Sequence, residues 1–373
     1  MKTIFITGAA GVIGSSIAEY LLKKTDNSIV LLLRAHSKEH LEERISSLAA
    51  FWGLSKTALL KNKRIVLLAG DLSQKKFGLS NEQYKQLSYR VTHIIHSAGH
   101  VKLSQTLSEA RANSVSLLEN VLSFVNDCKH HEFKKVEYIS TIGVAGKAPG
   151  TIPEKRLYNK HGFNNYYEQA KYECEERLFQ EIEEGIPITI HRPSMVVGDS
   201  KSGKIINFQI FYYLCEYFSG AYSNGILPDT KLFKLDIIPS DYISKAVTIS
   251  MDDDLTVGQI FHLCSGNQHA IILNDLNQLV EPSFQSQSKK QPFVIKIPID
   301  LMRLYAKVAP LWIRNTKRKK ALAASSYFLP YMKNVQIFNT IMTEKYFKEK
   351  NILIPNPKDY ITPILSYYMH HKK

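Results

Sequence analysis

The sequence predicts an α/β fold in which helices cover both faces of a doubly wound parallel sheet of about seven strands, followed by a smaller, mainly helical region. Three observations support this fold class. Short β-branched and apolar runs alternate with helical patterns between residues 3 and 266, as expected of βαβ units. A glycine-rich turn joins the first apolar run to the first helical pattern, and the alternation stops after about residue 266.

Seven short apolar runs are the predicted strands, because each is bounded by glycine or polar residues. In chain order they are TIFITG (3–8), SIVLLLRA (28–35), RIVLLAGD (64–71), VTHIIHSAG (91–99), KVEYISTIG (135–143), PITIHRPSMVVG (187–198) and QIFHLCSG (259–266). The helical patterns between them act as crossovers, so the strands are expected to run parallel. Residues 1–266 should therefore form one domain with an insertion at about 200–235, and residues 267–373 a substrate or partner region over the carboxyl ends of the strands.

The composition is that of a globular chain, with 44% hydrophobic and 22% charged residues. The longest apolar runs, such as 29–33, are far shorter than the roughly 18 residues of a membrane span. With no signal-peptide profile, we expect a cytoplasmic protein, either free or peripheral to a membrane. Four widely spaced cysteines argue against a disulfide framework or a zinc site. The histidines of HIIHSAGH lack partner cysteines or carboxylates, so no metal is expected.

The positive charge is concentrated in the last quarter of the chain. Residues 289–373 contain 17 Lys and Arg against 4 Asp and Glu, or +13, whereas residues 1–288 contain 31 against 30. This region is expected to meet a membrane surface or an acidic carrier protein, or else to be a solvated helical face. Its strongest basic run is RNTKRKK at 314–320. Nucleic acid is not expected, because no reading motif accompanies the charge.

A glycine-rich turn follows the first predicted strand in TIFITGAAGVIGSSIAEYLLKK. Gly8, Gly11 and Gly14 lie between that strand and a strongly apolar helix, where glycines permit a tight turn and close approach of the backbone to a pyrophosphate. The phosphate charge would then lie at the helix N-terminus, at Val12 and Ile13. We expect a dinucleotide cofactor here; a plain strand-to-helix turn is the alternative.

The end of the second predicted strand indicates which dinucleotide binds. Arg34 in LLLRAHS stands where an NAD-binding fold normally has Asp or Glu for the ribose 2′-hydroxyl. A cation there favours a 2′-phosphate, so the expected cofactor is NADP(H). Arg44, in the next helical pattern, is either a second phosphate contact or a solvated helix residue. Asp71 and the HSAG segment at 96–99 end later strands and are expected to border the adenine and ribose.

A Tyr-x-x-x-Lys pair supplies the predicted catalytic groups. About two chance matches are expected in this chain, and the matches include Tyr20/Lys24, Tyr167/Lys171 and Tyr346/Lys350. The second match alone follows a strand that ends in hydroxyl residues, Ser140 and Thr141. Residues four apart share a helix face, and a cation beside a phenol lowers the phenol's pKa. Thr141, Tyr167 and Lys171 are therefore the predicted catalytic residues.

With these motifs in this order, the chain resembles the extended short-chain dehydrogenase/reductases, and among them the thioester reductases and fatty acyl-CoA reductases of the male sterility type. The segments that support the resemblance are TGAAGVIG, LLLRAHSKEHLEERI, GDLSQKKFGLS, IIHSAGHV, ISTIGVAG, NNYYEQAKYECE, HRPSMVVGDSKSG and LDIIPSDYISKA, which cover residues 1 to about 266. The resemblance implies an NADP-binding Rossmann domain over residues 1–266. It also implies further cofactor contacts at Asp71, Leu72, Ser97, Ala98, Gly99, Lys171 and Pro193.

The activity implied by the resemblance is NADPH-dependent reduction of an acyl thioester, either an acyl-CoA or an acyl carrier protein conjugate. The product would be an aldehyde or, after a second hydride transfer, an alcohol. Two alternatives use the same residues differently. One is a dehydrogenase, epimerase or dehydratase that acts on a sterol or a nucleotide sugar. The other is a cofactor-binding interaction protein without turnover, against which the complete Thr, Tyr and Lys set argues.

Overall fold

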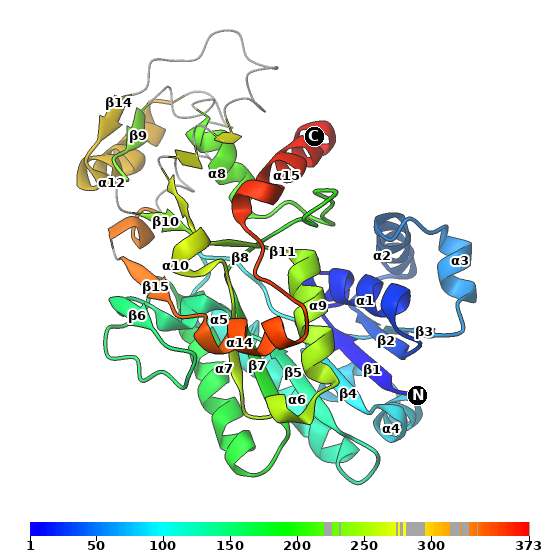
Figure 1. Ribbon diagram of the computed structural model, residues 1–373. Helices are drawn as coiled ribbons and strands as arrows, with labels where there is room; N and C mark the ends of the chain where they lie inside the picture. The colour runs from blue at the N-terminus through cyan, green and yellow to red at the C-terminus, as the bar shows by residue number, and fades with distance from the viewer. Residues whose placement is uncertain are drawn as a thin grey trace.

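The computed structural model describes residues 1–219, 226–230, 233–273, 275–276, 279–280, 295–313, 322, 328–333 and 335–372. Its central sheet has seven parallel strands in the order β12-β7-β5-β4-β1-β2-β3, which confirms the predicted doubly wound α/β fold (Figure 1). The strands are β1 (Thr3–Thr7), β2 (Ser28–Leu33), β3 (Ile65–Ala69), β4 (His93–His96), β5 (Lys135–Ile139), β7 (Ile188–Pro193) and β12 (Ile260–Leu263).

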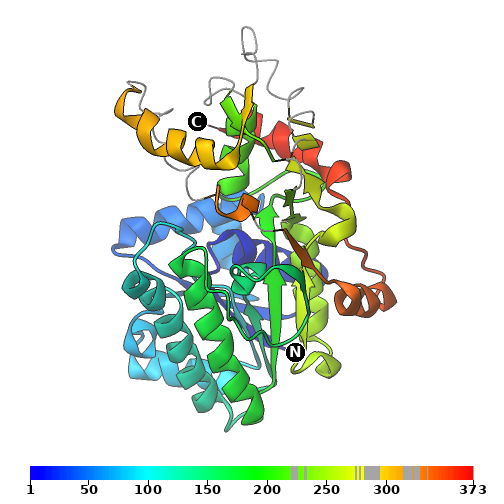
Figure 2. The same cartoon turned by 90° about the vertical axis from the view of Figure 1, so that its left-hand side faces the viewer.

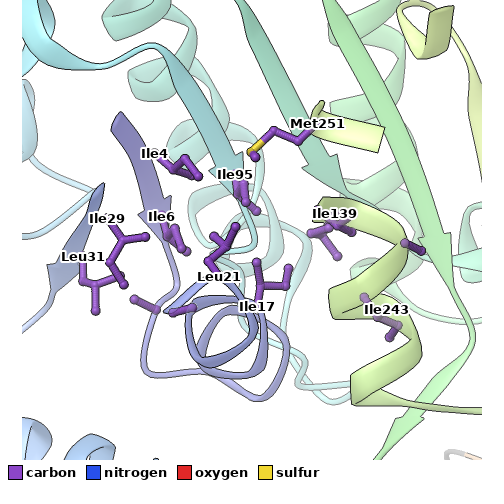
Figure 3. Packing of buried hydrophobic residues seen from close by; sticks show 14 of the residues in the cluster. Ile4, Ile6, Ile17, Leu21, Ile29, Leu31, Ile95, Ile139, Ile243 and Met251 are labelled. Atoms are coloured by element: carbon purple, nitrogen blue, oxygen red, sulfur yellow. The ribbon is translucent and has the colours of Figure 1, made fainter. Parts of the chain in front are cut away.

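Helices cover both faces of this sheet, because successive side chains of a strand point to opposite faces. Ile4 and Ile6 of β1 belong to a first core cluster with α1 (Val12–Lys24), α2 (Lys38–Phe51) and α9 (Ser240–Met251) (Figure 3). Phe5, which lies between them, belongs to a cluster on the opposite face. The helices of that face are α4 (Asn81–Arg90), α6 (Val115–Cys128) and α7 (Tyr166–Glu183).

Several of these helices begin at a side-chain cap that the sequence supplies. Ser80 forms a capping box with Gln83 at the start of α4, and Thr106 forms one with Glu109 at the start of α5 (Leu107–Ala112). Ser55 caps α3 (Lys56–Lys61). Among the described residues, short 3-10 helices lie between the longer elements: η1 (Lys75–Gly78), η2 (Ile142–Ala145), η3 (Asp254–Thr256), η4 (Ala309–Leu311) and η5 (Tyr331–Lys333).

The predicted strand at 187–198 is wrong in one respect, since the chain divides it in two. β7 ends at Pro193, and β8 (Met195–Val197) leaves the central sheet to pair in parallel with β11 (Ile237–Pro239). The other six strands end one to four residues before their predicted ends. In each case the last predicted residues turn away from the sheet and form the loops at its carboxyl edge, where the site lies.

The smaller region lies beyond the carboxyl ends of the strands in both views (Figures 1 and 2). It combines the insertion with the chain after residue 266, because Phe211, Met302 and Ile364 share one apolar cluster. Its elements are α8 (Ile210–Phe218), β9 (Ile226–Pro228), β10 (Lys234–Leu235), α10 (Gly266–His269), β13 (Ile271–Ile272), β14 (Ile295–Ile297), α12 (Ile299–Val308) and α15 (Pro357–His371). No helix within the described ranges is both long and apolar enough to cross a membrane.

Two C-terminal segments return to the layers of the central sheet. α14 (Ile341–Glu349) places Phe347 in the first core cluster, where Ile352 joins it. β15 (Gln336–Phe338) pairs in parallel with β6 (Gly150–Ile152), in the connection between β5 and α7. Residues 267–373 thus pack against the sheet domain as well as against the insertion, and the division of the chain at residue 266 remains a proposal.

Candidate active site

The glycine turn lies where the strand order reverses, between β1 and β4, which is the usual ligand crevice of a doubly wound sheet. Gly8 has a φ of 71°, and a Cβ there would lie 2.7 Å from the backbone nitrogen of Ala98. A Cβ at Gly14 would overlap the Gly8 carbonyl oxygen and lie 2.7 Å from Oγ of Ser97. Both positions therefore require glycine, and the structure brings Gly8, Gly14, Ser97 and Ala98 together.

The start of α1 suits a pyrophosphate. Gly11 is the N-cap residue, no side chain caps the first turn, and that turn holds no acidic residue. The first N–H groups of a helix have no partner within the helix, and the helix dipole favours an anion beside them. Val12 and Ile13 begin the helix here. An uncapped helix N-terminus that directly follows Gly8 and Gly11 and has no acidic residue in its first turn fits the pyrophosphate of a dinucleotide.

Two arginines meet at the carboxyl end of β2. Arg34 directly follows the strand and is exposed, whereas Arg44 of α2 is half-buried. Burial and the positive charge of Arg34 lower the pKa of Arg44. Burial acts to raise the pKa of Asp71, but hydrogen bonds from Ser73 and the charges of Arg34 and His36 hold it below the usual value. A 2′-phosphate between the two arginines would relieve their repulsion, so this end of the sheet fits NADP(H).

The remaining predicted cofactor residues occupy different surroundings. Leu72 is buried in the core cluster of the α6 face, and its carbonyl oxygen accepts a hydrogen bond from Nδ2 of Asn120 at 2.8 Å. Gly99 is exposed after β4, and Pro193 is buried at the end of β7. These positions border the carboxyl edge of the sheet, but their contacts with a cofactor stay predictions. No sequence motif surrounds Asn120, so its hydrogen bond to the Leu72 carbonyl oxygen could not be predicted.

Thr141 and Tyr167 form the centre of the site. Thr141 follows β5, and its Oγ1 accepts a hydrogen bond from the backbone N–H of Gly143 at 3.1 Å. Tyr167 lies in the first turn of α7, and the Thr141 side chain is near enough to act on its pKa. Two hydroxyl groups thus stand together at the carboxyl end of β5, two strands from the glycine turn. This pair can bind one carbonyl oxygen.

Ser140, the other hydroxyl residue at this strand end, has a different role. It is 4% exposed, and its Oγ donates a hydrogen bond to the carboxylate of Glu175. The same carboxylate forms a buried, two-bonded ion pair with Arg192, at 3.0 Å from Nε and 2.6 Å from Nη2. Since Ser140 is used by this network, Thr141 is the hydroxyl that remains for a substrate.

Lys171 lies one turn after Tyr167 and is 4% exposed. Its Nζ donates hydrogen bonds to Oη of Tyr138 at 2.7 Å and to the carbonyl oxygen of Ile139 at 2.8 Å. Behind Tyr138, the His96 ring accepts or donates a 2.7 Å hydrogen bond with Oγ1 of Thr7. Burial and the nearby charge of Lys171 lower the pKa of His96 to about 3, so this imidazole is neutral.

The electrostatics of Tyr167 correct the sequence-based expectation. The Lys171 ammonium was expected to lower the pKa of Tyr167. Instead, burial and then the Glu168 carboxylate raise the pKa of Tyr167, and only the Thr141 side chain acts to lower it. The Lys171 ammonium is directed to Tyr138 and the backbone of β5. Tyr167 is therefore a phenol that keeps its proton at neutral pH, suited to donate it.

The other predicted Tyr-x-x-x-Lys matches lie elsewhere. Tyr20 and Lys24 are on α1, and Tyr346 and Lys350 are at α14, where both contact Asp253. In the part of the chain that the structure describes, no group of three or more His, Cys, Asp or Glu side chains could hold a metal ion. The four cysteines are buried free thiols.

Comparison with known proteins identifies the family of this chain. A family model described as male sterility protein matches residues 6–247, which is more than half of the chain. The chain belongs to the male sterility protein family. The predicted extended short-chain dehydrogenase/reductase type is confirmed by this match, and with it the cofactor class, NAD(P), and the enzyme class, an NAD(P)-dependent oxidoreductase. The preference for NADP(H) and the roles of single residues stay predictions.

Relatives of this member of the male sterility protein family include large synthetases. It is 27% identical over 270 residues to the nonribosomal peptide synthetase asaC of Aspergillus flavus, over 70% of this chain and 26% of that protein. Its fold is similar to the terminal R domain from the myxalamid PKS-NRPS biosynthetic pathway, with a TM-score of 0.80, 24% identity and coverage of 100% of this chain and 91% of that chain. A thiolation-reductase di-domain from an archaeal non-ribosomal peptide synthetase gives a TM-score of 0.76 at 19% identity, over 98% and 75% of the two chains. The chain spans less than a third of the first curated relatives it matches.

Proposed function

We propose that this protein reduces an acyl thioester with NADPH and releases an aldehyde and a thiol. The observation that supports this proposal most directly is the placement of Thr141 and Tyr167 together at the carboxyl end of β5, on the same edge of the sheet as the glycine turn. Two proteins of similar structure, a terminal R domain and a thiolation-reductase di-domain, support the same activity.

In the proposed reaction, each residue of the site has one task. The bound nicotinamide cofactor supplies the hydride that adds to the thioester carbonyl carbon. Thr141 and Tyr167 hydrogen-bond the carbonyl oxygen, where negative charge develops. Tyr167, whose pKa is raised by burial and by Glu168, gives its proton to that oxygen. Collapse of the resulting hemithioacetal breaks the carbon–sulfur bond and leaves an aldehyde and a thiol, for a net uptake of one hydride and one proton.

Lys171 of α7 supports this chemistry from its buried position against β5. Its ammonium is held by Tyr138 and the Ile139 carbonyl, so its position is fixed before any ligand binds. From the floor of the crevice it can bind the nicotinamide ribose and orient it toward Thr141. Burial lowers the pKa of Lys171, although the neighbouring Cys174 and Glu175 act to raise it.

We further propose that the acyl group is presented on a carrier protein rather than as a free acyl-CoA. The similar thiolation-reductase di-domain and the synthetase relatives support this choice, and the +13 charge of residues 289–373 suits an acidic carrier. An anionic membrane is the competing partner. Leu311 and Trp312, which are 75% and 76% exposed, precede the basic run at 314–320, and that run lies outside the described residues.

Binding assays separate these partners. Carrier protein binding should weaken with added salt, because exposed charges are screened over about 8–10 Å at physiological ionic strength. Replacing Lys317, Arg318, Lys319 and Lys320 with Gln should weaken it as well, while reduction of a short soluble acyl-CoA is spared. Binding to anionic liposomes that exceeds binding to the carrier would instead favour the membrane.

Substrate panels test the activity itself. NADPH oxidation should be stimulated by carrier-bound or CoA thioesters, and not by sterols or nucleotide sugars. Tyr167→Phe removes only the transferable proton, so turnover should fall by about 100-fold or more with NADPH binding kept. Tyr166→Phe, on the exposed neighbouring residue, is the matched control and should be silent. Thioester turnover that survives Tyr167→Phe would refute the assignment.

A further inference from the structure

Three buried side chains form a polar row across the carboxyl ends of neighbouring strands. Thr7 of β1 pairs in register with His96 of β4, and His96 pairs in register with Tyr138 of β5. Residues that pair in register on parallel strands point to the same face of a sheet. All three side chains are at most 2% exposed. The row lies on the face that α6 and α7 cover, because Tyr138 belongs to the core cluster of that face.

Direct contacts connect the members of the polar row. Oγ1 of Thr7 and Nδ1 of His96 share a hydrogen bond of 2.7 Å. The rings of His96 and Tyr138 pack with their centroids 5.5 Å apart. Thr7 immediately precedes Gly8, the first glycine of the turn, and Thr141 follows the strand that carries Tyr138. The row therefore connects the strand that leads into the cofactor turn with the strand that leads to the proposed catalytic residues.

The last member of the row holds the Lys171 ammonium. Nζ of Lys171 donates hydrogen bonds to Oη of Tyr138 at 2.7 Å and to the carbonyl oxygen of Ile139 at 2.8 Å. The same Nζ lies 4.3 Å from the centre of the Tyr138 ring. An ammonium group has three N–H donors. Since these two contacts use two of them, the tetrahedral geometry of the group fixes the direction of the third.

Burial makes the Tyr138 contact important for ligand binding. Lys171 is 4% exposed, and a buried charge requires hydrogen-bond partners. Without the phenol oxygen, the ammonium would lose one of these two acceptors and could turn about its bond to the Ile139 carbonyl. The long lysine side chain would then have to be ordered when a ligand binds, which reduces the affinity for that ligand.

We propose that Tyr138 is a positioning residue that directs the Lys171 ammonium toward the ribose of the nicotinamide half of the cofactor, with the polar row as its support. The proposal rests on the proposed function, because that function gives Lys171 the task of binding this ribose. At 1% exposure, Tyr138 has almost no surface to offer a ligand, so it acts through Lys171. The test must separate this role from that of a tyrosine that only fills the core.

A double-mutant cycle on NADPH affinity makes this distinction. Tyr138→Phe removes one oxygen atom and keeps the ring, so it isolates the hydrogen bond to Lys171. It should weaken equilibrium binding of NADPH by about two- to tenfold, which is the cost of ordering one long side chain on binding. In a Lys171→Met background the same change should have no effect, because the residue through which Tyr138 acts is absent. An equal loss in both backgrounds would show that Tyr138 only supports the core, and the proposal would be overturned.

A truncated ligand locates the effect within the cofactor. Adenosine 2′,5′-bisphosphate carries the 2′-phosphate but has no nicotinamide ribose. Its affinity should therefore be the same in Tyr138→Phe and in the wild-type protein. A loss equal to that of NADPH would place the effect away from the nicotinamide ribose and would also overturn the proposal. This comparison does not need Lys171→Met, so it remains decisive if that variant fails to fold.

Tyr84→Phe is the matched control variant. Tyr84 belongs to the same core cluster as Tyr138, is 8% exposed, and donates a hydrogen bond from Oη to Oδ2 of Asp127 at 2.8 Å. Loss of its hydroxyl should leave NADPH affinity unchanged, because Tyr84 has no contact with Lys171. A loss of affinity as large as that of Tyr138→Phe would mean that any buried hydroxyl of this cluster has the same effect, which contradicts the proposal.

Thioester turnover separates this inference from the proposed function. If NADPH affinity shows the expected coupling between Tyr138 and Lys171 but the wild-type protein reduces no thioester, the proposed function fails and the role of Tyr138 stands. If the wild-type protein reduces thioesters but Tyr138→Phe binds NADPH as tightly as the wild type, the proposed function stands and the inference is overturned.

Discussion

Replacing Arg34 with Asp should weaken the preference for NADPH over NADH, and the exposure of the two arginines indicates the size of the loss. Arg34 follows β2, is exposed, and occupies the chain position where an acidic residue would bind a ribose 2′-hydroxyl. Arg44 is half-buried and near enough for the charge of Arg34 to lower its pKa. The 2′-phosphate of NADPH is the only part of the cofactor that this pair would bind. NADH, which lacks the phosphate, should be indifferent to Arg34.

The size of the effect follows from the exposure of the two guanidinium groups. Two unit charges 4 Å apart attract by about 1 kcal/mol in water and by about 4 kcal/mol near a protein surface. A lost hydrogen bond to a charged group is worth about 1.5–3 kcal/mol, which lies between those limits and suits an exposed Arg34 supported by Arg44. Affinity for NADPH should therefore fall by roughly ten- to hundredfold, at 1.36 kcal/mol for each factor of ten.

Equilibrium binding of NADPH and NADH, followed by the fluorescence of the reduced nicotinamide, measures this change. In Arg34→Asp, the ratio of the NADPH dissociation constant to the NADH dissociation constant should rise by roughly ten- to hundredfold. Arg44→Met should lower NADPH affinity as well. Lys24→Ala, an exposed change on α1, should alter neither constant. Equal affinities for NADPH and NADH in the wild-type protein, or an equal loss of both in Arg34→Asp, would refute the assignment of the phosphate site.

Three further outcomes are expected. Lys171→Ala should impair both turnover and cofactor affinity, because it removes the cation that we propose binds the nicotinamide ribose. An unimpaired enzyme would contradict this role. Arg192→Leu leaves the Glu175 carboxylate buried without its ion-pair partner and should lower the free energy of unfolding in urea by about 3–5 kcal/mol. The double variant Glu175→Leu/Arg192→Leu should lower it by less. A loss below about 1 kcal/mol in Arg192→Leu would show that the ion pair is solvated. In the folded protein the pKa of His96 is about 3, so the imidazole stays neutral at pH 5–7. In the unfolded chain it gains a proton below about pH 6.5. Its contribution to stability is therefore present above that pH and is lost as the pH falls. His96→Gln should therefore reduce the loss of unfolding free energy between pH 7 and pH 5 by about 2 kcal/mol; an unchanged difference would mean that the imidazole is solvated.

The sequence was sufficient to predict the sheet and the glycine turn because both depend on local patterns. Apolar runs of strand length give the seven strands, and glycine spacing gives the turn. The division of the 187–198 run could not be predicted, since the pairing of β8 with β11 joins residues about 40 positions apart. Nor does the β5 run indicate that Lys135 and Glu137 are fully buried, with Nζ of Lys135 bonded to the carbonyl oxygens of Ser250 and Asp253.

The site shows the same limit. Helical spacing places Tyr167 and Lys171 on one face, but it cannot reveal that the ammonium binds Tyr138 of the neighbouring strand. Ser140 and Thr141 are equivalent by sequence, and only the buried Glu175 carboxylate distinguishes them. Tyr331, which accepts a hydrogen bond from Nδ2 of Asn165, follows that residue by 166 positions and belongs to no motif. Residues whose roles depend on such distant contacts are found only when the fold is known.

The packing of α14 against the sheet has a consequence for the order in which the protein can mature on the ribosome. All seven strands are synthesised by Leu263, but Phe347 and Ile352, which belong to the first core cluster, follow by 84 and 89 residues. At about 5–20 residues per second, the nascent sheet waits roughly 4–18 seconds with part of its apolar face uncovered. During that interval the unfinished domain is a natural client for a chaperone. A fragment cut at residue 266 for laboratory expression would carry the same uncovered face permanently, and should aggregate where the longer chain does not.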